Sequence, residues 1–268
     1  MVTMALLMAS LVGMGAAAGA GDDDYPGWHD APLPDGPAGA AIELGRRILM
    51  HTPENAPAYS GNVLNCTSCH LDAGRRPWSS PWVGVWGVFP EYRSRNARMN
   101  SLQGRIADCF ERSLNGKAPP DNSDEMLGML AYLQWLSRAV PTGKSVTGRG
   151  FSRLTSRHQP DPVNGRQVYA DKCALCHGAD GQGTFGASGE MVYPPLWGDK
   201  SFNIGAGMAR LNTAAAFVKA NMPFGQGGSL SDEDAIDVAA YFTTQPRPDF
   251  PGKGADWPGG GKPKDARY

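Results

Sequence analysis

The sequence predicts an all-α fold made of two similar domains joined by a linker. Three observations predict this fold class. The motif CxxCH occurs twice, at residues 66–70 and 173–177, and each copy lies in a stretch of helical periodicity. No run of alternating apolar residues is long enough to propose a framework of strands. The 268 residues suffice for two modest domains, and an apolar content of 41% is typical of globular proteins.

CxxCH is the attachment motif of c-type haem. Its two cysteines bind the porphyrin through thioethers, and the histidine that follows becomes an iron ligand. A zinc knuckle or a redox cysteine pair could also use such residues, but two copies about a hundred residues apart favour haem. We therefore expect two covalently attached haem c groups. They would be held by Cys66, Cys69 and His70, and by Cys173, Cys176 and His177.

The first residues have the pattern of an export signal. An apolar centre too short to span a bilayer is followed by small residues, which predicts a signal peptide at residues 1–20. A buried first helix or a membrane anchor is the alternative, since no basic residue precedes the apolar centre. Haem c is attached outside the bacterial cytoplasm, so we expect a periplasmic protein with no membrane attachment in its mature form. The net charge of −1 gives no general attraction for nucleic acid.

Residues 21–140 are expected to form an N-terminal cytochrome c domain. Apolar spacing predicts a helix across residues 42–49, ahead of the first motif. A second helix is expected from Asn100, with Gln103 as its capping-box partner. A third is expected from Ser123, with an apolar face that includes methionines better suited to core packing than to iron.

The polar residues 141–162 are expected to form the linker, because they lack an apolar period. Residues 163–244 then repeat the plan of helix, motif, glycine-rich loop and closing helix, as a C-terminal cytochrome c domain. Ser231 with Asp234 forms a capping-box pattern at the start of the closing helix. A Pro/Gly-rich tail, residues 245–268, is expected to lie over the surface.

A methionine is the expected sixth ligand of the second haem. Met191, Met208 and Met222 are all available in the loop beyond His177. Met222 is favoured, because it lies just ahead of the closing helix and because Pro223 would stiffen the loop that presents its sulfur. A thioether ligand raises the haem potential, which suits a site where electrons leave.

The fifth cysteine, Cys109, remains after four have formed thioethers. It lies 39 residues beyond His70, where a sixth ligand of the first haem is due. On a helix, Arg105, Cys109 and Ser113 share one stripe, because they are spaced i, i+4 and i+8. A small buried apolar role for this cysteine is the alternative, with Met99 as a weaker candidate ligand. We expect Cys109 to bind the first iron as a thiolate.

A local basic field surrounds this cysteine in the sequence. Residues 75–117 contain eight basic side chains and three acidic ones. Arginine binds oxyanions through two parallel hydrogen bonds and stays charged in a partly dry cleft. Some of these arginines should pair with haem propionates, and the remainder could form a solvated basic face. The favoured interpretation assigns Arg95 and Arg105 to an anionic substrate.

Several segments of the chain resemble the di-haem thiosulfate dehydrogenases. They are FPEYRSR at 89–95, LQGRI at 102–106, DCFERSLNG at 108–116, and in the tail DWP at 256–258 and KPKD at 262–265. The resemblance covers almost all of the chain after the leader, and the cysteine stretch is its most specific part. It implies an enzyme that joins two thiosulfates into tetrathionate, although some members run the reverse reaction.

The resemblance also implies roles for individual residues. The active-site haem of the first domain would be bound by His70 and Cys109, and the electron-transfer haem of the second by His177 and Met222. The substrate pocket would include Arg95, Arg105 and Ser113. Two electrons would pass through both haems to an external cytochrome c or iron–sulfur protein. The competing hypothesis is a di-haem electron carrier without a substrate of its own.

One position departs from some members of that family. They have a lysine directly before the methionine, and this lysine binds the iron in one oxidation state. The present chain has Asn221 there, so the resemblance predicts no such ligand switching.

Overall fold

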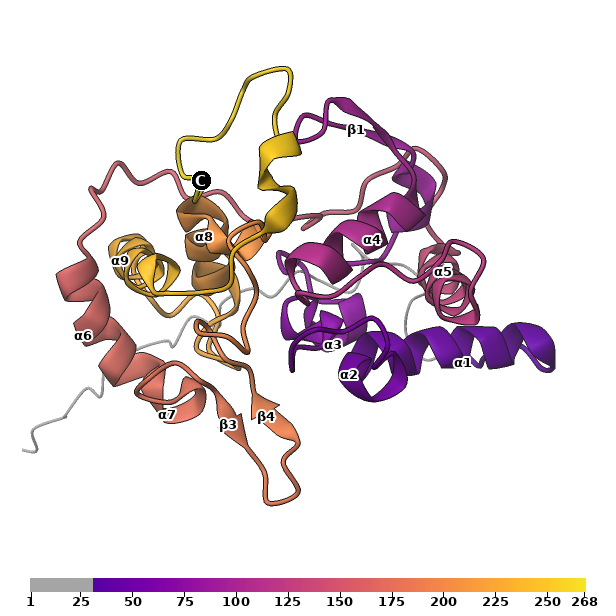
Figure 1. Cartoon of the computed structure of the whole chain (residues 1–268), viewed down its shortest axis with the longest axis horizontal. Coiled ribbons are helices and arrows are strands. Elements are labelled where there is room, and N and C mark those ends of the chain that lie inside the picture. Colours follow the sequence, from indigo (N-terminus) through magenta and orange to yellow (C-terminus); the bar gives the residue numbers. More distant parts are fainter. Residues whose placement is uncertain (1–30) are drawn as a thin grey trace, which may run out of the picture.

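The computed structural model describes residues 31–268, so the expected signal peptide lies outside the described residues. Two helical domains lie side by side, with α1–α5 in one and α6–α9 in the other (Figure 1). This arrangement confirms the predicted all-α class. Nowhere in residues 31–268 is there a helix with the length and apolar character needed to cross a bilayer.

The first domain contains five α-helices, two 3-10 helices and one hairpin within the described residues. They are α1 (Pro37–Met50), α2 (Thr52–Asn55), η2 (Cys66–Ser68), α3 (Leu71–Gly74), η3 (Val85–Val88), β1 (Glu91–Arg93), β2 (Arg98–Asn100), α4 (Leu102–Arg112) and α5 (Asp124–Ser137). The second domain and the tail also consist of helices and one short hairpin. They contain α6 (Pro162–Lys172), α7 (Ala174–His177), β3 (Thr184–Phe185), β4 (Met191–Tyr193), η4 (Gly207–Ala209), α8 (Leu211–Asn221), α9 (Asp232–Thr244) and η5 (Pro251–Ala255).

The two hairpins were not expected from the sequence. β1 pairs antiparallel with β2, with Tyr92 opposite Met99, and β3 pairs antiparallel with β4. Each strand has at most three residues, which is too short to produce a readable alternation of apolar and polar side chains. The first hairpin leads directly into α4, and so it helps to place this helix, which carries Cys109 and is called the cysteine helix below.

Glycine allows the first and last helices of each domain to cross closely. A Cβ atom at Gly45 in α1 would lie 1.9 Å from the carbonyl oxygen of Gly128 in α5. In the second domain a Cβ at Gly165 in α6 would lie 1.9 Å from the carbonyl oxygen of Asp237 in α9. No side chain fits at either crossing, so both domains are built on the same helix contact.

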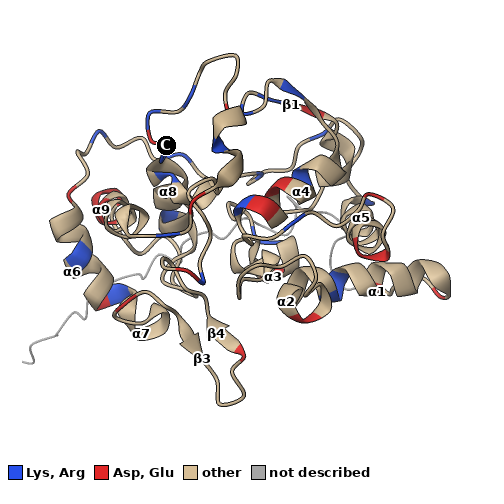
Figure 2. Cartoon of the chain, in the orientation of Figure 1, with Lys and Arg blue, Asp and Glu red and all other residues tan. Residues whose placement is uncertain are grey.

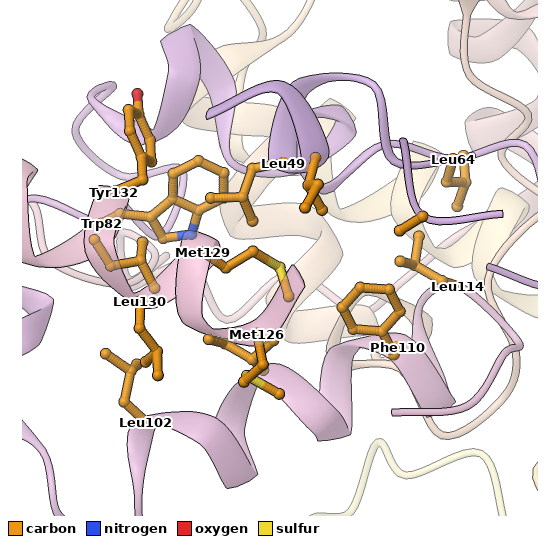
Figure 3. Packing of buried hydrophobic residues seen from close by; sticks show 14 of the residues in the cluster. Leu49, Leu64, Trp82, Leu102, Phe110, Leu114, Met126, Met129, Leu130 and Tyr132 are labelled. Atoms are coloured by element: carbon orange, nitrogen blue, oxygen red, sulfur yellow. The ribbon is translucent and has the colours of Figure 1, made fainter. Parts of the chain in front are cut away.

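The core of the first domain fills the space between α1, α4 and α5 (Figure 3). Phe110, Met126 and Met129 are fully buried in it. The two methionines therefore pack in the core, as their helical spacing predicts. Phe110 faces this core from α4, which leaves the opposite side of the cysteine helix free to line a cavity.

Serine caps fix where the predicted helices begin. Ser123 accepts a hydrogen bond from the Met126 amide, and Ser231 accepts one from Asp234, so these two helix starts are confirmed. The helix expected from Asn100 begins instead at Leu102, because Asn100 belongs to β2 and Ser101 is the residue that caps α4.

Most of the tail is exposed or half-buried, as expected of a segment that lies over the surface, but two of its aromatic side chains are buried. Phe250 and Trp257 are buried, and the Trp257 amide donates a hydrogen bond to the Arg95 carbonyl at 2.6 Å. In Figure 1 the tail (yellow) leaves α9, passes beside α4 and returns toward α8. Its aromatic and acidic side chains hold it against the first domain, although proline and glycine dominate its composition.

Candidate active site

A cavity of about 500 Å³ lies between the first domain, the linker, the start of α8 and the tail, and both His70 and Cys109 line it. Cys109 is placed there by α4, which is held in the domain by the buried side chains of Leu102, Ile106 and Phe110. The stripe predicted from the helical spacing is realised, because Arg105 and Ser113 line the same cavity. Ser113 is the C-cap of α4, and its amide donates to the Cys109 carbonyl at 2.8 Å.

His70 is held in the orientation that a metal-binding histidine requires. Its Nδ1 lies 2.6 Å from the carbonyl oxygen of Ser80, which places the proton on Nδ1 and leaves Nε2 as the free lone pair. Burial, together with the positive charge of Arg105, lowers the pKa of His70 to about 4, although the hydrogen bond to Ser80 acts in the opposite direction. The imidazole is therefore neutral at physiological pH and able to bind iron.

The guanidinium of Arg105 contacts the sulfur of Cys109 directly. Its Nη1 lies 3.0 Å from Sγ, and the two residues are one helical turn apart on α4. A hydrogen bond from a charged donor stabilises negative charge on sulfur. The arrangement therefore places a positively charged hydrogen-bond donor beside the Cys109 sulfur.

Arginines dominate the wall of this cavity. Among the described residues that line it, six arginines face two carboxylates. The arginines are Arg93, Arg95, Arg105, Arg112, Arg149 and Arg210, and the acids are Glu91 and Asp108. Figure 2 shows basic positions on α4 and beside β1. This excess of positive charge could hold haem carboxylates and a small dianion together.

Two of these arginines have a buried Nε atom without a hydrogen-bond acceptor in the described chain, namely Arg93 and Arg210. Burial lowers the pKa of Arg93, and the charge of Arg105 lowers it further. Binding of an anion would supply the missing acceptor and relieve the repulsion between these cations.

The tail anchors two further arginines of the wall through one buried carboxylate. Asp256, with a side chain 2% exposed, accepts hydrogen bonds at 2.8 Å from both Nη atoms of Arg112. It also accepts one from Arg95 at 3.4 Å and one from the hydroxyl of Tyr268. The indole of Trp257 lies 5.0 Å from the Arg95 guanidinium. The tail thus fixes how these two guanidinium groups are oriented.

Sequence reasoning missed three residues of this arrangement. Arg149 comes from the linker, Arg210 from the residue before α8, and Asp256 from the tail. Each lies far from the cysteine in the chain and reaches the site only through tertiary packing. Asp256 alone had a signal, because it begins the DWP segment of the resemblance.

The second cavity, of about 350 Å³, lies against the other motif. Cys173, Cys176, His177 and Met222 line it, and so do the alternative ligands Met191 and Met208. The Nδ1 atom of His177 lies 2.8 Å from the Pro194 carbonyl, which again leaves Nε2 free, and burial lowers the pKa of this histidine. Cys69 of the first motif also lines this cavity, so the two motifs approach each other where the domains meet.

The residues of both sites fit covalently attached haem. Each motif histidine is neutral, has its Nδ1 tied to a backbone carbonyl and lines a cavity, which is the usual preparation of a proximal ligand. Burial raises the pKa of the Cys66 and Cys69 thiols to about 12, so neither is a free thiolate. This agrees with cysteines that form thioethers rather than metal bonds.

Comparison with known families divides the chain into two cytochrome segments. A family described as "SoxA/TsdA, cytochrome c domain" matches residues 58–142. A second, described as "Cytochrome C oxidase, cbb3-type, subunit III", matches residues 160–242. Each match contains one of the two CxxCH motifs.

Four similar proteins that match most of this chain are thiosulfate dehydrogenases. The chain is 50% identical to that of Psychrobacter arcticus over 238 residues, which is 89% of this chain and 73% of the relative. It is 49% identical to that of Allochromatium vinosum over 224 residues, which is 82% of this chain and 83% of the relative.

A solved structure shares the architecture of most of this chain. The thiosulfate dehydrogenase TsdBA of Marichromatium purpuratum superposes with a TM-score of 0.79 at 38% identity, over 88% of this chain. The present chain spans half the length of that protein. The two family matches agree with the two cavities, each of which is lined by the histidine of one CxxCH motif. The relatives that match most of the chain lead to the same conclusion. The chain therefore belongs to the thiosulfate dehydrogenase family, and it is a two-domain cytochrome c that carries two covalently bound haem c groups.

Proposed function

We propose that the protein joins two thiosulfate ions into one tetrathionate ion and releases two electrons. In this reaction a bond forms between the terminal sulfurs of the two ions, and the two electrons leave the enzyme. The observation that carries the proposal is the contact between Arg105 and the Cys109 sulfur inside a cavity lined by arginines. A simple electron carrier has no need for a cationic cavity of this size beside one of its haem ligands.

In the proposal, His70 and Cys109 hold the iron of the first haem and His177 with Met222 holds that of the second. The motif cysteines Cys66, Cys69, Cys173 and Cys176 attach the two porphyrins. When bound, the two haems supply the capacity to accept one electron each. A thiolate lowers the potential of its iron and a thioether raises it, so electrons move from the first domain to the second.

The barrier that the chain must lower is electrostatic. Two unit charges about 4 Å apart repel by about 1 kcal/mol in water and about 4 kcal/mol near a protein surface. Two thiosulfate dianions carry four such pairs of charges, so bringing them together is costly without positive charge nearby. Arg95 and Arg105 bind these anions in the proposal, and they act at a fixed position because Asp256 and α4 orient them.

Ser113 completes the substrate pocket in the proposal. It follows directly on α4, one turn beyond Cys109, and it lines the same cavity. Its hydroxyl can donate to a sulfonate oxygen, which would direct the terminal sulfur of thiosulfate toward Cys109.

We infer that the electrons pass to a small cytochrome c or an iron–sulfur protein, and that the mature chain works in the periplasm. The second cavity includes exposed Phe224 and Val192, so a partner could approach it from solvent. Attachment of haem c outside the bacterial cytoplasm supports the periplasmic assignment.

Replacement of Cys109 tests the proposal. The variant Cys109→Ala, with both haems attached, should lose thiosulfate oxidation with an artificial electron acceptor but still exchange electrons with a reductant through its second haem. Met99→Ala is the matched control, because Met99 is exposed on β2 and should leave the activity unchanged. Full thiosulfate oxidation by the Cys109 variant would refute the assignment of Cys109 to the active site, and a wild type that does not oxidise thiosulfate would leave only an electron carrier.

A further inference from the structure

The last residue of α8, Asn221, lies at the junction of the two domains and is fully buried. The Nδ2 atom of its side chain donates to the backbone carbonyl oxygen of Trp78 at 3.2 Å and to that of Phe217 at 3.1 Å. The Oδ1 atom of its side chain accepts from Nε of Arg76 at 3.1 Å. Both amide hydrogens are therefore used, and two of the three bonds cross from the second domain to the first.

The segment that Asn221 contacts also orients the iron ligand of the first domain. Ser80, two residues beyond Trp78, provides the carbonyl that fixes Nδ1 of His70. Trp78 and Ser80 both have a left-handed backbone, with φ of 62° and 53°. Residues other than glycine adopt this backbone only where surrounding bonds impose it. Here those bonds come from the linker, since the Trp78 amide donates to Gly148 and the Ser80 amide to Gly150.

The other neighbour of Asn221 is Met222, the proposed sixth ligand of the second haem. Met222 is the C-cap of α8, with its amide bonded to the Val218 carbonyl at 2.8 Å, and it lines the second cavity together with His177. A continuous path of short contacts thus joins the two ligand sets. It runs from His70 through Ser80 and Trp78 to Asn221, and then along one peptide to Met222.

We propose that Asn221 is a positioning residue that clamps Met222 against the His70-orienting segment of the other domain. The clamp keeps the methionine sulfur at the second iron, and it makes the position of that sulfur depend on the segment that holds His70. A displacement of the segment that orients His70 would therefore change how firmly the Met222 sulfur is held at the second iron. This inference rests on the assignment of Met222 as a ligand in the proposed function.

The test compares three variants of the holoprotein in the oxidised state. Asn221→Ala removes all three bonds, Arg76→Met removes only one bond across the domains, and Asn212→Ala changes an exposed asparagine of the same helix. Two quantities are measured. One is the weak long-wavelength absorption band of methionine-ligated ferric haem, and the other is the affinity for added imidazole, followed as loss of that band.

The loss of one buried hydrogen bond shifts an equilibrium by about fivefold. We therefore expect Arg76→Met to bind imidazole about fivefold more tightly than the wild type, and Asn221→Ala to do so by a larger factor, with a weaker band. Asn212→Ala should match the wild type. An effect of Asn221→Ala without any effect of Arg76→Met would assign Asn221 to the end of its own helix, and that would overturn the clamp.

Unchanged imidazole affinity in both variants would also overturn it, and Arg76→Met answers the question even if the asparagine variant does not fold. A wild type without the methionine band would overturn the clamp together with the assignment of Met222. Thiosulfate oxidation measured on the same wild-type sample is a separate result, so failure of the proposed reaction is distinguishable from failure of the clamp.

Discussion

Replacement of Arg105 by glutamine removes the positive charge beside Cys109 while it keeps much of the volume of the side chain. In the structure Nη1 of Arg105 lies 3.0 Å from the cysteine sulfur, in a cavity where other arginines surround the same space. The change therefore removes one particular hydrogen bond and leaves most of the local positive charge. Its effect measures the contact itself.

The size of the effect follows from that bond. A hydrogen bond to a charged group contributes about 1.5–3 kcal/mol. If the bond is made to charge that is fully developed in the transition state, this free energy corresponds to a loss of about 10- to 150-fold in kcat/KM. Loss of the donor should also lower the potential of the first haem, because the sulfur then donates more electron density to iron.

Steady-state oxidation of thiosulfate with an artificial acceptor provides the assay. Arg98→Gln is the matched control, because Arg98 is exposed on β2, does not line the cavity and loses the same charge. We expect Arg98→Gln to stay within twofold of the wild type. Equal losses in the two variants would mean that only the overall charge matters, and full activity of Arg105→Gln would refute the role of the contact.

Two further predictions concern buried carboxylates. Asp256→Asn removes the charge that holds Arg112. We therefore expect a lower kcat/KM for thiosulfate and faster proteolysis of the tail. Asp249→Asn, on the exposed part of that tail, is the control and should change neither quantity. The second prediction concerns Asp237. Burial raises the pKa of Asp237, but hydrogen bonds from Asp161, Asn164 and His158 outweigh the effect of burial and lower the pKa overall. The stabilisation from this carboxylate is therefore present above the unfolded pKa of about 3.9 and is lost as pH falls below it. We expect Asp237→Asn to lose less thermal stability than the wild type when the pH is lowered through this range. An equal loss of stability in the variant and the wild type would contradict this.

The sequence was most informative where the chemistry is local. The CxxCH motifs and the unpaired Cys109 can be read from a few neighbouring residues. Helical spacing alone places Arg105 and Ser113 beside that cysteine, because the geometry of one helix decides it. Ser123 and Ser231 were identified as helix caps for the same reason.

The remaining parts depend on contacts between distant segments. Arg149 and Arg210 reach the cavity because the linker and α8 pack against the first domain, and no local pattern predicts that approach. The tail was expected at the surface from its proline and glycine content, yet Asp256 is buried through its pairing with Arg112. The crossing at Gly45 was also missed, since it depends on the backbone of α5.

The magnetic and near-infrared spectra of the oxidised holoprotein test the central claim most directly. If His70 and Cys109 hold the first iron, one haem gives the low-spin ferric signal and charge-transfer absorption of thiolate ligation, and the other gives those of histidine and methionine. Cys109→Ala should remove only the thiolate component. Two histidine–methionine haems in the wild type, with no thiolate component, would contradict the proposed site.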